Sequence, residues 1–176
     1  MDLSRTILEA NRLFLVPKSS AHAQYIISEY RDPVTRHLNH EPPGSLPLLL
    51  ERIEEQRAAM KAGQALFLSV LLKGSDEFIG CFALENIGSE QPEMGGWLKA
   101  SAFGNRYGQE VAARIKQWAG DHLSYQHLLW PCAIENIASR KLAESLGGYI
   151  VREYDKRTSD GQTSQYVEYA IPRLAM

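Results

Sequence analysis

The stretch whose residue types and spacing suggest chemistry covers residues 93–123. It predicts a short strand, a loop containing Gly104 and Gly108, and the beginning of a long amphipathic helix. The first N–H groups of a helix lack partners within the helix, and its dipole places positive charge there. We therefore predict that this loop holds the pyrophosphate of a coenzyme, with Gly104 and Gly108 allowing the ligand to approach the backbone closely. An ordinary helix N-terminus without a ligand would show the same local pattern.

The flanking sequence predicts alternating buried strands and amphipathic helices. Apolar runs and alternation predict strands at residues 12–17, 65–72, 78–85, 93–99, 127–134, 149–156 and 164–171. Helical spacing of apolar residues predicts helices at 19–30, 46–60, 105–123 and 136–146, with a short turn at 34–37. The turn at 73–77 joins two strands as an antiparallel hairpin. Residues 1–10 predict a ragged lead-in, and residues 40–44 predict a loop.

This order of elements, β-α-α-β-β-β-α-β-α-β-β, is neither a repeated βα unit nor an all-β pattern. It predicts an α+β (mixed α/β) fold with a central, mostly antiparallel twisted sheet and helices on its faces. The expected number of strands is about seven. The sequence has no internal repeat or linker, so we expect residues 1–176 to form a single domain.

The composition limits the classes of function. Charged residues make up 23% and hydrophobic residues 44% of the chain, and the net charge is −2, which does not favour a nucleic-acid or membrane binder. The sequence has neither a signal-peptide pattern nor a run of about 18 apolar residues, so we expect a cytoplasmic protein. Cys81 and Cys132 are isolated and are expected to be reduced core thiols. No His, Cys and carboxylate set has metal-ligand spacing.

Five motifs lie, in order, at residues 12–17, 78–80, 93–98, 103–110, and 136–139 with Leu142, Leu146 and Gly147. Together these motifs resemble the GNAT superfamily of acyl-CoA N-acyltransferases, most closely its ribosomal-protein-acetylating (RimJ/RimL-like) branch. They resemble, in turn, the branch's opening strand, its Ile-Gly hairpin return, its Glu-Ile-Gly-Tyr-Trp-Leu strand, its Trp-Gly-Lys-Gly-Tyr-Ala-Thr-Glu loop and its Asn-x-x-Ser…Leu-Gly-Phe helix. The resemblance covers nearly the whole chain. It implies a GNAT-like fold that is splayed open between two central strands, with acetyl-CoA in the cleft and no metal.

The resemblance also implies residues for the coenzyme site. The backbone of Trp97, Leu98 and Lys99 would pair with the pantetheine arm like an added strand. Amides of the loop would bind the pyrophosphate, and Asn136 would bind pantetheine near its thiol, close to Ser139; the loop residues are Asn105, Arg106, Tyr107 and Gly108. The family has glycine where this chain has Arg106, whose side chain either crowds the loop or adds a cation against a phosphate. We expect the amides of Tyr107 and Gly108 to hold the pyrophosphate, with Arg106 turned outward.

The implied reaction is direct attack of a neutral primary amine on the thioester carbon, with a backbone N–H near Leu98 facing the developing oxyanion. Glu85 and Glu93 are the candidates for the base that takes the amine proton, acting through water. Each also suits a solvated strand end. Many family members carry an acidic tyrosine seven residues after the asparagine, where this chain has Ala143. Ser139 is the nearest substitute, or else a polar residue that stabilises the first helical turn.

Other residues carry weaker expectations from the same resemblance. His37 and His40 lie where the family shapes its acceptor pocket, although exposed loop histidines would look the same. Arg140 and Lys141 either reach the coenzyme phosphates or belong to a solvated helix face. The family's Leu-Gly-Phe is Leu146-Gly147-Gly148 here, so Tyr149 is expected to replace the missing core aromatic. Trp97 is expected to line the cleft, and Trp118 and Trp130 the core.

Three functions from different classes fit the sequence. The first is an N-acetyltransferase that acts on a protein N-terminus, a polyamine, an amino acid or an aminoglycoside, with the branch resemblance favouring a protein or peptide. The second is a non-catalytic acyl-CoA- or metabolite-binding module with a degraded site, because Arg106 and Ala143 depart from the family pattern. The third is a structural subunit whose strand edge mediates dimerisation, and a homodimer is also compatible with the first.

Overall fold

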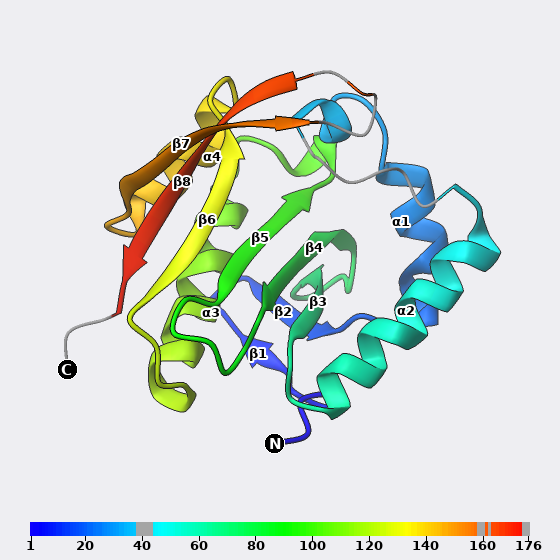
Figure 1. Ribbon diagram of the computed structural model, residues 1–176. Coiled ribbons are helices and arrows are strands. Elements are labelled where there is room, and N and C mark those ends of the chain that lie inside the picture. Colours follow the sequence, from blue (N-terminus) through cyan, green and yellow to red (C-terminus); the bar gives the residue numbers. More distant parts are fainter. Residues whose placement is uncertain (38–43, 158–160, 162, 174–176) are drawn as a thin grey trace.

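The computed structural model describes residues 1–37, 44–157, 161 and 163–173 (Figure 1). The strands are β1 Leu8–Glu9, β2 Leu13–Pro17, β3 Leu66–Leu72, β4 Phe78–Glu85, β5 Glu93–Leu98, β6 His127–Ala133, β7 Tyr149–Arg157 and β8 Thr163–Pro172. The α-helices are α1 Ala23–Glu29, α2 Leu46–Lys61, α3 Tyr107–His122 and α4 Ile137–Ser145. Short 3-10 helices occupy Ser20–His22, Val34–His37 and Ala100–Ala102. His40 and most of the loop expected at 40–44 lie outside the described residues.

One sheet joins all the described strands in the order β1-β2-β3-β4-β5-β6-β8-β7. Its neighbouring strands run antiparallel except β5 and β6, which are parallel and share the single register pair Glu93↔Leu129. Because the two strands pair at that one position, they separate beyond it (Figure 1). The predicted mixed fold, mostly antiparallel and splayed between two central strands, is confirmed.

The N-terminal segment differs from the expected ragged lead-in. Leu8 of β1 pairs with Leu15 of β2, and the side chains of Leu3 and Leu8 are buried in the main core. β1 therefore adds an eighth strand at one edge of the sheet. A strand of two residues is too short to show the alternation that reveals strands in a sequence.

Helices cover both faces of the sheet, with α1 and α2 on one and α3 and α4 on the other (Figure 1). On the α3 side, Val111, Ile115 and Trp118 enter the main core, as the helical spacing predicts. On the other side, residues of α1 and α2 form a second cluster with the sheet: Ala23, Ile26, Leu49, Ile53, Phe78 and Cys81. Cys81 and Cys132 are buried and free, which confirms the expected core thiols.

The ends of α4 explain one wrong prediction. Asn136 caps the helix as expected, because its side-chain oxygen accepts a hydrogen bond from the Ser139 N–H at 3.1 Å. Gly147 follows the helix with φ 81°. Tyr149, however, is 57% exposed on the edge strand β7 and does not replace the missing core aromatic. Tyr169 of β8 is buried instead, and its hydroxyl donates a hydrogen bond to Glu144 of α4 at 2.8 Å.

We predict that Gly80→Ala destabilises the sheet. A Cβ at Gly80 of β4 would collide with the Trp97 carbonyl oxygen and lie 2.8 Å from Leu98 Cα, both in the backbone of β5. Because the β5 backbone cannot move aside without leaving the sheet, the expected loss is about 1–3 kcal/mol in the free energy of unfolding.

Urea unfolding measures this loss, with Gly120→Ala as the matched control. A Cβ at Gly120 in α3 would meet nothing within 4 Å, so the control should gain about 0.5–1 kcal/mol. Equal stability of the two variants would contradict the close packing of β4 against β5.

Candidate active site

The register of β3, β4 and β5 builds the floor of a cavity. Ala83 of β4 lies opposite Phe67 of β3 and Gly95 of β5, so two small residues sit side by side in the sheet. A Cβ at Gly95 would meet nothing within 4 Å, which shows that this position faces open space. The resulting cavity has a volume of about 600 Å³ and extends from α1 and α2 across the sheet to β6 and α4.

Five residues expected to belong to the site line this cavity. They are Glu85, Glu93, Trp97, Asn136 and Ser139. The first three share the face of the sheet that carries α1 and α2, because side chains at every second position of a strand point the same way. Asn136 and Ser139 come from the opposite wall, at the beginning of α4. The fold thus brings both candidate bases and the candidate acid to one hollow.

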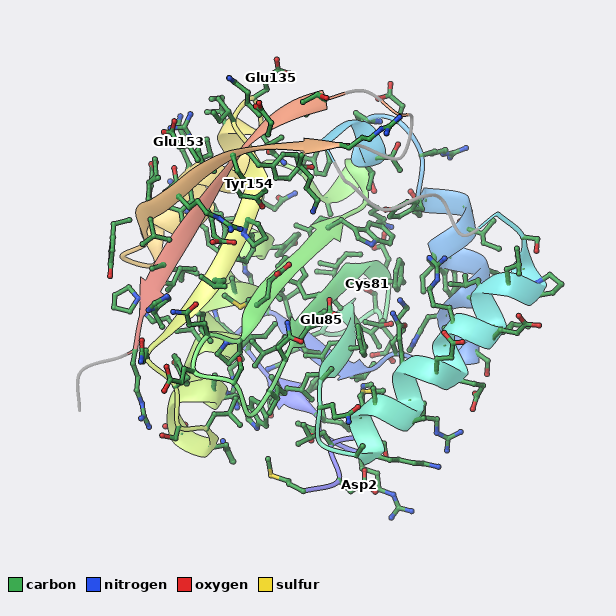
Figure 2. All side chains as sticks on the ribbon, in the orientation of Figure 1. Asp2, Cys81, Glu85, Glu135, Glu153 and Tyr154 are labelled. Carbon is green, nitrogen blue, oxygen red and sulfur yellow. The ribbon has the colours of Figure 1, made fainter. Side chains whose placement is uncertain are left out.

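Glu85 lies in the cavity wall and has a raised pKa. It ends β4 directly opposite Glu93 of β5, and Figure 2 labels it beside β5. Burial raises the pKa of Glu85, and the nearby Lys18 cation opposes that rise. A carboxylate with a raised pKa is a better proton acceptor than one at its usual value.

The cavity wall next to α1 and α2 contains residues that the sequence did not single out. Lys18 follows the last residue of β2, and its backbone N–H donates to the Phe67 carbonyl at 2.8 Å. Arg52 and Gln56 come from α2, while Tyr30 packs edge-on against Trp97 with ring centroids 5.3 Å apart. Burial raises the pKa of Tyr30 to about 12. These residues come from distant parts of the chain, so periodicity alone could not bring them together.

The thiol Cys81 stays protonated in this wall. It lies in β4 opposite Trp97 and is labelled in Figure 2. Burial raises its pKa to about 11, although Lys18 opposes the shift. A neutral thiol is a poor nucleophile, so Cys81 shapes the cavity without offering a covalent route.

The opposite wall is held together by Ser139. Its hydroxyl accepts a hydrogen bond from Trp130 Nε1 at 2.8 Å, so its own proton can be donated, and the Cys132 sulfur is one acceptor within reach. Trp130 is buried as expected, yet it also lines the cavity beside Cys132. Ala143 is fully buried in the main core, so its position supplies no acid to the cavity.

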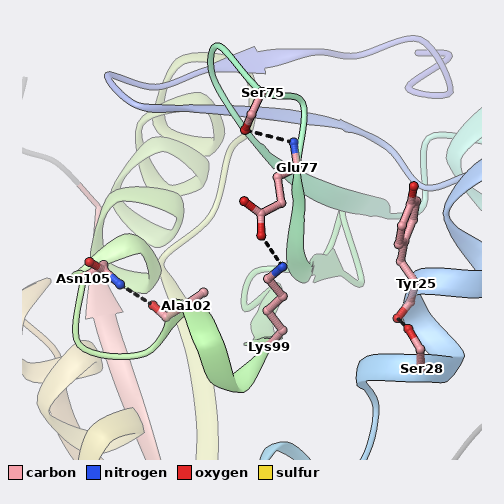
Figure 3. Close-up of polar contacts among 7 residues, drawn as sticks. All are labelled: Tyr25, Ser28, Ser75, Glu77, Lys99, Ala102 and Asn105. Atoms are coloured by element: carbon pink, nitrogen blue, oxygen red, sulfur yellow. Dashed lines mark hydrogen bonds and ion pairs between the residues drawn. The ribbon is translucent and has the colours of Figure 1, made fainter.

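The edge of β5 that faces β6 presents particular backbone groups. The Lys99 N–H donates to the Ile79 carbonyl at 2.8 Å, and the Lys99 ammonium pairs with Glu77 at 2.5 Å (Figure 3). Since N–H groups alternate sides along a strand, those of Gly96 and Leu98 point toward β6. The Lys99 amide, expected to contact pantetheine, is thus already bound within the sheet.

The glycine loop leads into α3 through an unusual backbone conformation. Arg106, the residue before the helix, is exposed and adopts φ 61° and ψ 18°, and no side chain among the described residues caps the helix. The Asn105 side-chain NH₂ donates to the carbonyls of Ala102 and Phe103 at 3.3 and 3.1 Å, the first shown in Figure 3. The amides of the first turn of α3 therefore remain available to an anion.

Gly108 has a different reason to be glycine from the one expected. A Cβ there would lie 3.0 Å from Leu142 Cδ1 and 3.8 Å from Leu98 Cδ1. The absent side chain would therefore point toward α4 and β5, inside the protein. Gly108 allows close packing of α3, whereas Gly104, with φ 77°, provides the turn.

Arg12 fixes this loop from the other end of the chain. Its backbone N–H and its Nε donate to the two carboxylate oxygens of Glu110, at 2.6 and 2.7 Å. Its Nη2 donates to the Asn105 carbonyl at 3.1 Å, and its guanidinium lies 4.5 Å from the Tyr107 ring centroid. The sequence placed Arg12 only in an opening strand and did not predict this role.

Other expected site residues lie elsewhere. The Arg140 guanidinium donates to the Tyr169 hydroxyl at 3.1 Å and to the Ile134 carbonyl at 3.3 Å, so it braces the protein interior. Lys141 is exposed on α4. The backbone of His37 ends a 3-10 helix, while the structure does not describe its side chain. Within the described ranges, no group of three or more His, Cys, Asp or Glu residues could hold a metal ion.

No helix in the described part of the chain is long and apolar enough to cross a membrane.

Solved structures with this fold include several acetyltransferases. RimL, the ribosomal L7/L12 alpha-N-protein acetyltransferase in complex with coenzyme A, is 14% identical, with a TM-score of 0.85 over 95% of this chain and 98% of that one. The acetyltransferase from Salmonella typhimurium that modifies the N-terminal serine of ribosomal protein L7/L12 is 14% identical, with a TM-score of 0.83 over 95% and 99%. The microcin C7 self-immunity acetyltransferase MccE, in complex with acetyl-CoA and AMP, is 16% identical, with a TM-score of 0.82 over 92% and 93%. At such identities these likenesses show a shared fold.

The sequence itself gives the family. No curated protein matches the chain significantly. The model of the acetyltransferase (GNAT) domain matches residues 12–148, which include the loop, both walls of the cavity and the Asn136 cap. Because this match covers most of the chain, the protein belongs to the acetyltransferase (GNAT) domain family.

Proposed function

We propose that this protein transfers an acetyl group from acetyl-CoA to a primary amine by direct attack of the amine on the thioester. Acetyl-CoA is the acyl donor of this family, and the protein is an acetyl-CoA-dependent N-acetyltransferase. One observation carries the mechanism: the divergence of β5 and β6 opens a cavity that holds Glu85 on one wall and Ser139 on the other. A base and an acid on facing walls suit a reaction in which one proton leaves the amine and another reaches the thiolate.

The coenzyme fits the open edge of β5 and the first turn of α3. The free N–H groups of Gly96 and Leu98 can pair with the pantetheine amides as an added strand would. The uncapped amides of Tyr107 and Gly108 face an anion favourably at the positive end of the helix dipole. Arg106 adds a cation at the same helix end, and its left-handed backbone is the conformation that glycine adopts most easily. The Arg106 side chain thus changes the charge of the loop, while its backbone keeps the conformation that glycine would favour.

The proton transfers then follow from the residues present. Glu85, acting through water, takes a proton from the amine as its nitrogen attacks the thioester carbon. The Leu98 N–H stabilises the negative charge that develops on the thioester oxygen. When the carbon–sulfur bond breaks, the Ser139 hydroxyl donates a hydrogen bond to the leaving thiolate, while Trp130 holds its oxygen in place. Glu93, which lies opposite Glu85 on β5, is the second carboxylate in the same cavity.

A non-catalytic binding module is the less favoured function. The reason to consider it was that Arg106 and Ala143 depart from the family pattern. The Arg106 backbone still adopts the loop conformation, and Ala143 lies in the core without removing Glu85 or Ser139 from the cavity. Both residues proposed for the proton transfers therefore still line the cavity.

Thermal-shift titration with acetyl-CoA, followed by measurement of thiol release with a panel of amines, tests the proposed function. We expect stabilisation by acetyl-CoA and amine-dependent release of coenzyme A. Stabilisation without turnover on any amine would favour the binding module, and no stabilisation at millimolar coenzyme would reject both functions.

Filling the cavity should stop turnover without unfolding the protein. Gly95→Val places a side chain into open space on the cavity floor, in a strand where valine is favourable. We expect the thermal midpoint to be retained and kcat/KM for the amine to fall about tenfold or more, equivalent to about 1.4 kcal/mol. Thermal unfolding and thiol release measure the two effects. Unchanged turnover in a folded Gly95→Val protein would show that the acceptor does not enter this cavity.

Loosening the loop should weaken binding of the coenzyme. Arg12→Gln removes the charged hydrogen bonds to Glu110 and Asn105 that fix the loop. The expected increase in Kd for coenzyme A is about tenfold, which corresponds to a loss of about 1.5 kcal/mol, the lower end of the range for a hydrogen bond to a charged group.

Calorimetry measures that affinity, with Arg57→Gln as the control. Arg57 forms an exposed ion pair with Glu54 at 3.9 Å on α2, far in sequence from the loop. Its substitution should leave Kd unchanged. An Arg12→Gln protein with wild-type affinity would show that the loop keeps its shape without the clamp.

The pH dependence of kcat/KM should report Glu85. Because burial raises its pKa, the carboxylate protonates at a higher pH than usual, and activity should fall as the pH falls through that value. Lys18→Met removes the cation that opposes the rise, so the falling limb should move to higher pH. Glu85→Gln should abolish the limb and lower kcat about a hundredfold.

Steady-state rates across pH provide the measurement, and Glu93→Gln is the control that should retain the limb. The other charged residues that line the same cavity are Arg52 of α2 and Lys156 of β7. Both residues stay unchanged in the Lys18→Met, Glu85→Gln and Glu93→Gln variants. If Glu93→Gln removes the limb and Glu85→Gln retains it, the two carboxylates have exchanged roles.

A further inference from the structure

The cavity has two chemically different ends. Asn136, Ser139 and Trp130 form the end at β6 and α4, where the proposed thioester lies. The end between β2 and α2 carries the cations Lys18 and Arg52 beside the amide of Gln56. Glu85 and Glu93 lie in the same cavity, at the ends of β4 and β5 that pair with each other.

Lys18 is a cation that forms no ion pair with any described residue, although the Glu85 carboxylate in the same cavity attracts it. Its backbone hydrogen bond to Phe67 extends the pairing of β2 with β3, which places the side chain in the row that contains Ala83 and Gly95. Burial lowers the pKa of Lys18, and Arg52 lowers it further, while Cys81 and Glu85 oppose the shift. Among the described residues, none forms a hydrogen bond or ion pair with the Lys18 ammonium. The half-buried Lys18 and the exposed Arg52 are neighbouring cations at this end of the cavity, and together they favour an anion between them.

Arg52 and Gln56 extend this end of the cavity along α2. They are four residues apart, so both side chains lie on one face of the helix together with Leu49. Arg52 has no ion-pair partner in the described part of the chain. The side-chain oxygen Oε1 of Gln56 is buried without a hydrogen-bond partner. A buried acceptor oxygen without a donor is a position at which a ligand N–H would be favourable.

We propose that the acceptor is a small α-amino acid, whose carboxylate binds Lys18 and Arg52 and whose amine points toward Glu85 and the thioester end of the cavity. This inference rests on the proposed N-acetyltransferase activity and specifies its substrate class. The planar fork of Arg52 suits a carboxylate, because two parallel N–H groups can bind its two oxygens. The amine of the same molecule then lies near the base that must take its proton.

The other classes of acceptor fit these charges less well. Polyamines and aminoglycosides would bring additional positive charge toward Lys18 and Arg52, which is unfavourable. A protein N-terminus has a neutral peptide group in the place of the amino acid's carboxylate. It would bring no anion to Arg52, and Lys18 would keep only the attraction of the Glu85 carboxylate. The charge pattern therefore favours the free amino acid over the peptide that the branch resemblance suggested.

The test compares amino acids with their own α-carboxamides, which keep the side chain and the amine and mimic a peptide N-terminus. We measure kcat/KM by thiol release for alanine, serine, leucine, methionine, phenylalanine and the corresponding amides, corrected for the fraction of free amine. Spermidine and a short peptide complete the panel. The wild-type protein should prefer at least one acid over its amide by about tenfold or more, as expected for charge-assisted hydrogen bonds.

Arg52→Gln provides the decisive comparison. It should lower kcat/KM for the preferred acid about tenfold and leave that for its amide within about twofold, because only the acid offers a carboxylate. Taking the ratio of variant to wild type for each compound cancels the difference in amine pKa between acid and amide. Arg57→Gln, on the exposed side of the same helix, should change neither value.

The following outcomes would reject an α-amino acid as the acceptor. An amide, the peptide or spermidine that matches or exceeds every acid would overturn it, as would an equal loss for acid and amide in Arg52→Gln. Those results would leave the N-acetyltransferase activity intact, since an amine would still be acetylated. Absence of turnover with every amine, while calorimetry still detects acetyl-CoA binding, would reject both the acceptor class and the proposed catalysis.

Discussion

The divergence of β5 from β6 is the constraint on which the rest of the site depends. The two strands pair at Glu93 and Leu129 and then separate, so the N–H and carbonyl groups of β5 that face β6 beyond that point lack a neighbouring strand. Unpaired backbone groups inside a protein are unfavourable unless water or a ligand satisfies them. An extended molecule with its own amides can supply that missing strand. The same separation creates the space that the facing side chains need.

The loop before α3 shows how a sequence can depart from its family pattern and retain the local geometry. Left-handed backbone is unfavourable for a residue with a Cβ by about 1–2 kcal/mol, and Arg106 nevertheless adopts it. Arg12 and Glu110 compensate by tying the loop to the turn between β1 and β2 through several short hydrogen bonds. The clamp also neutralises Glu110, which lies in the first turn of α3 near the proposed anion site. The loop is therefore held in part by a residue almost a hundred positions earlier in the chain.

The elements that extend over several turns or pairs were predictable from the sequence, because periodicity records which face is buried. The helical spacing gave α2 and α3, and the Asn136 cap marked the beginning of α4. β1 could not be predicted, because a strand of two residues is too short to show a periodic pattern. Gly108 looked like a site of ligand approach, yet Leu142 explains it, and packing partners are invisible in a linear motif. Tyr149 was misplaced for the same reason, since only the sheet order reveals that β7 is an edge.

The site itself was predictable on one side only. Glu85, Glu93, Asn136 and Ser139 stand in motifs, whereas Lys18, Arg52 and Gln56 have neighbours that give no hint of chemistry. The difference has a physical basis. The donor half of the site relies on backbone groups and a helix end, which local sequence determines.

The acceptor half relies on side chains that meet only when α2 packs over the sheet. Its chemistry can change through substitutions on α2 that leave the sheet, the loop and the α4 cap in place. One surface helix can therefore set which amine enters, while the open edge of β5 continues to hold the same acyl donor.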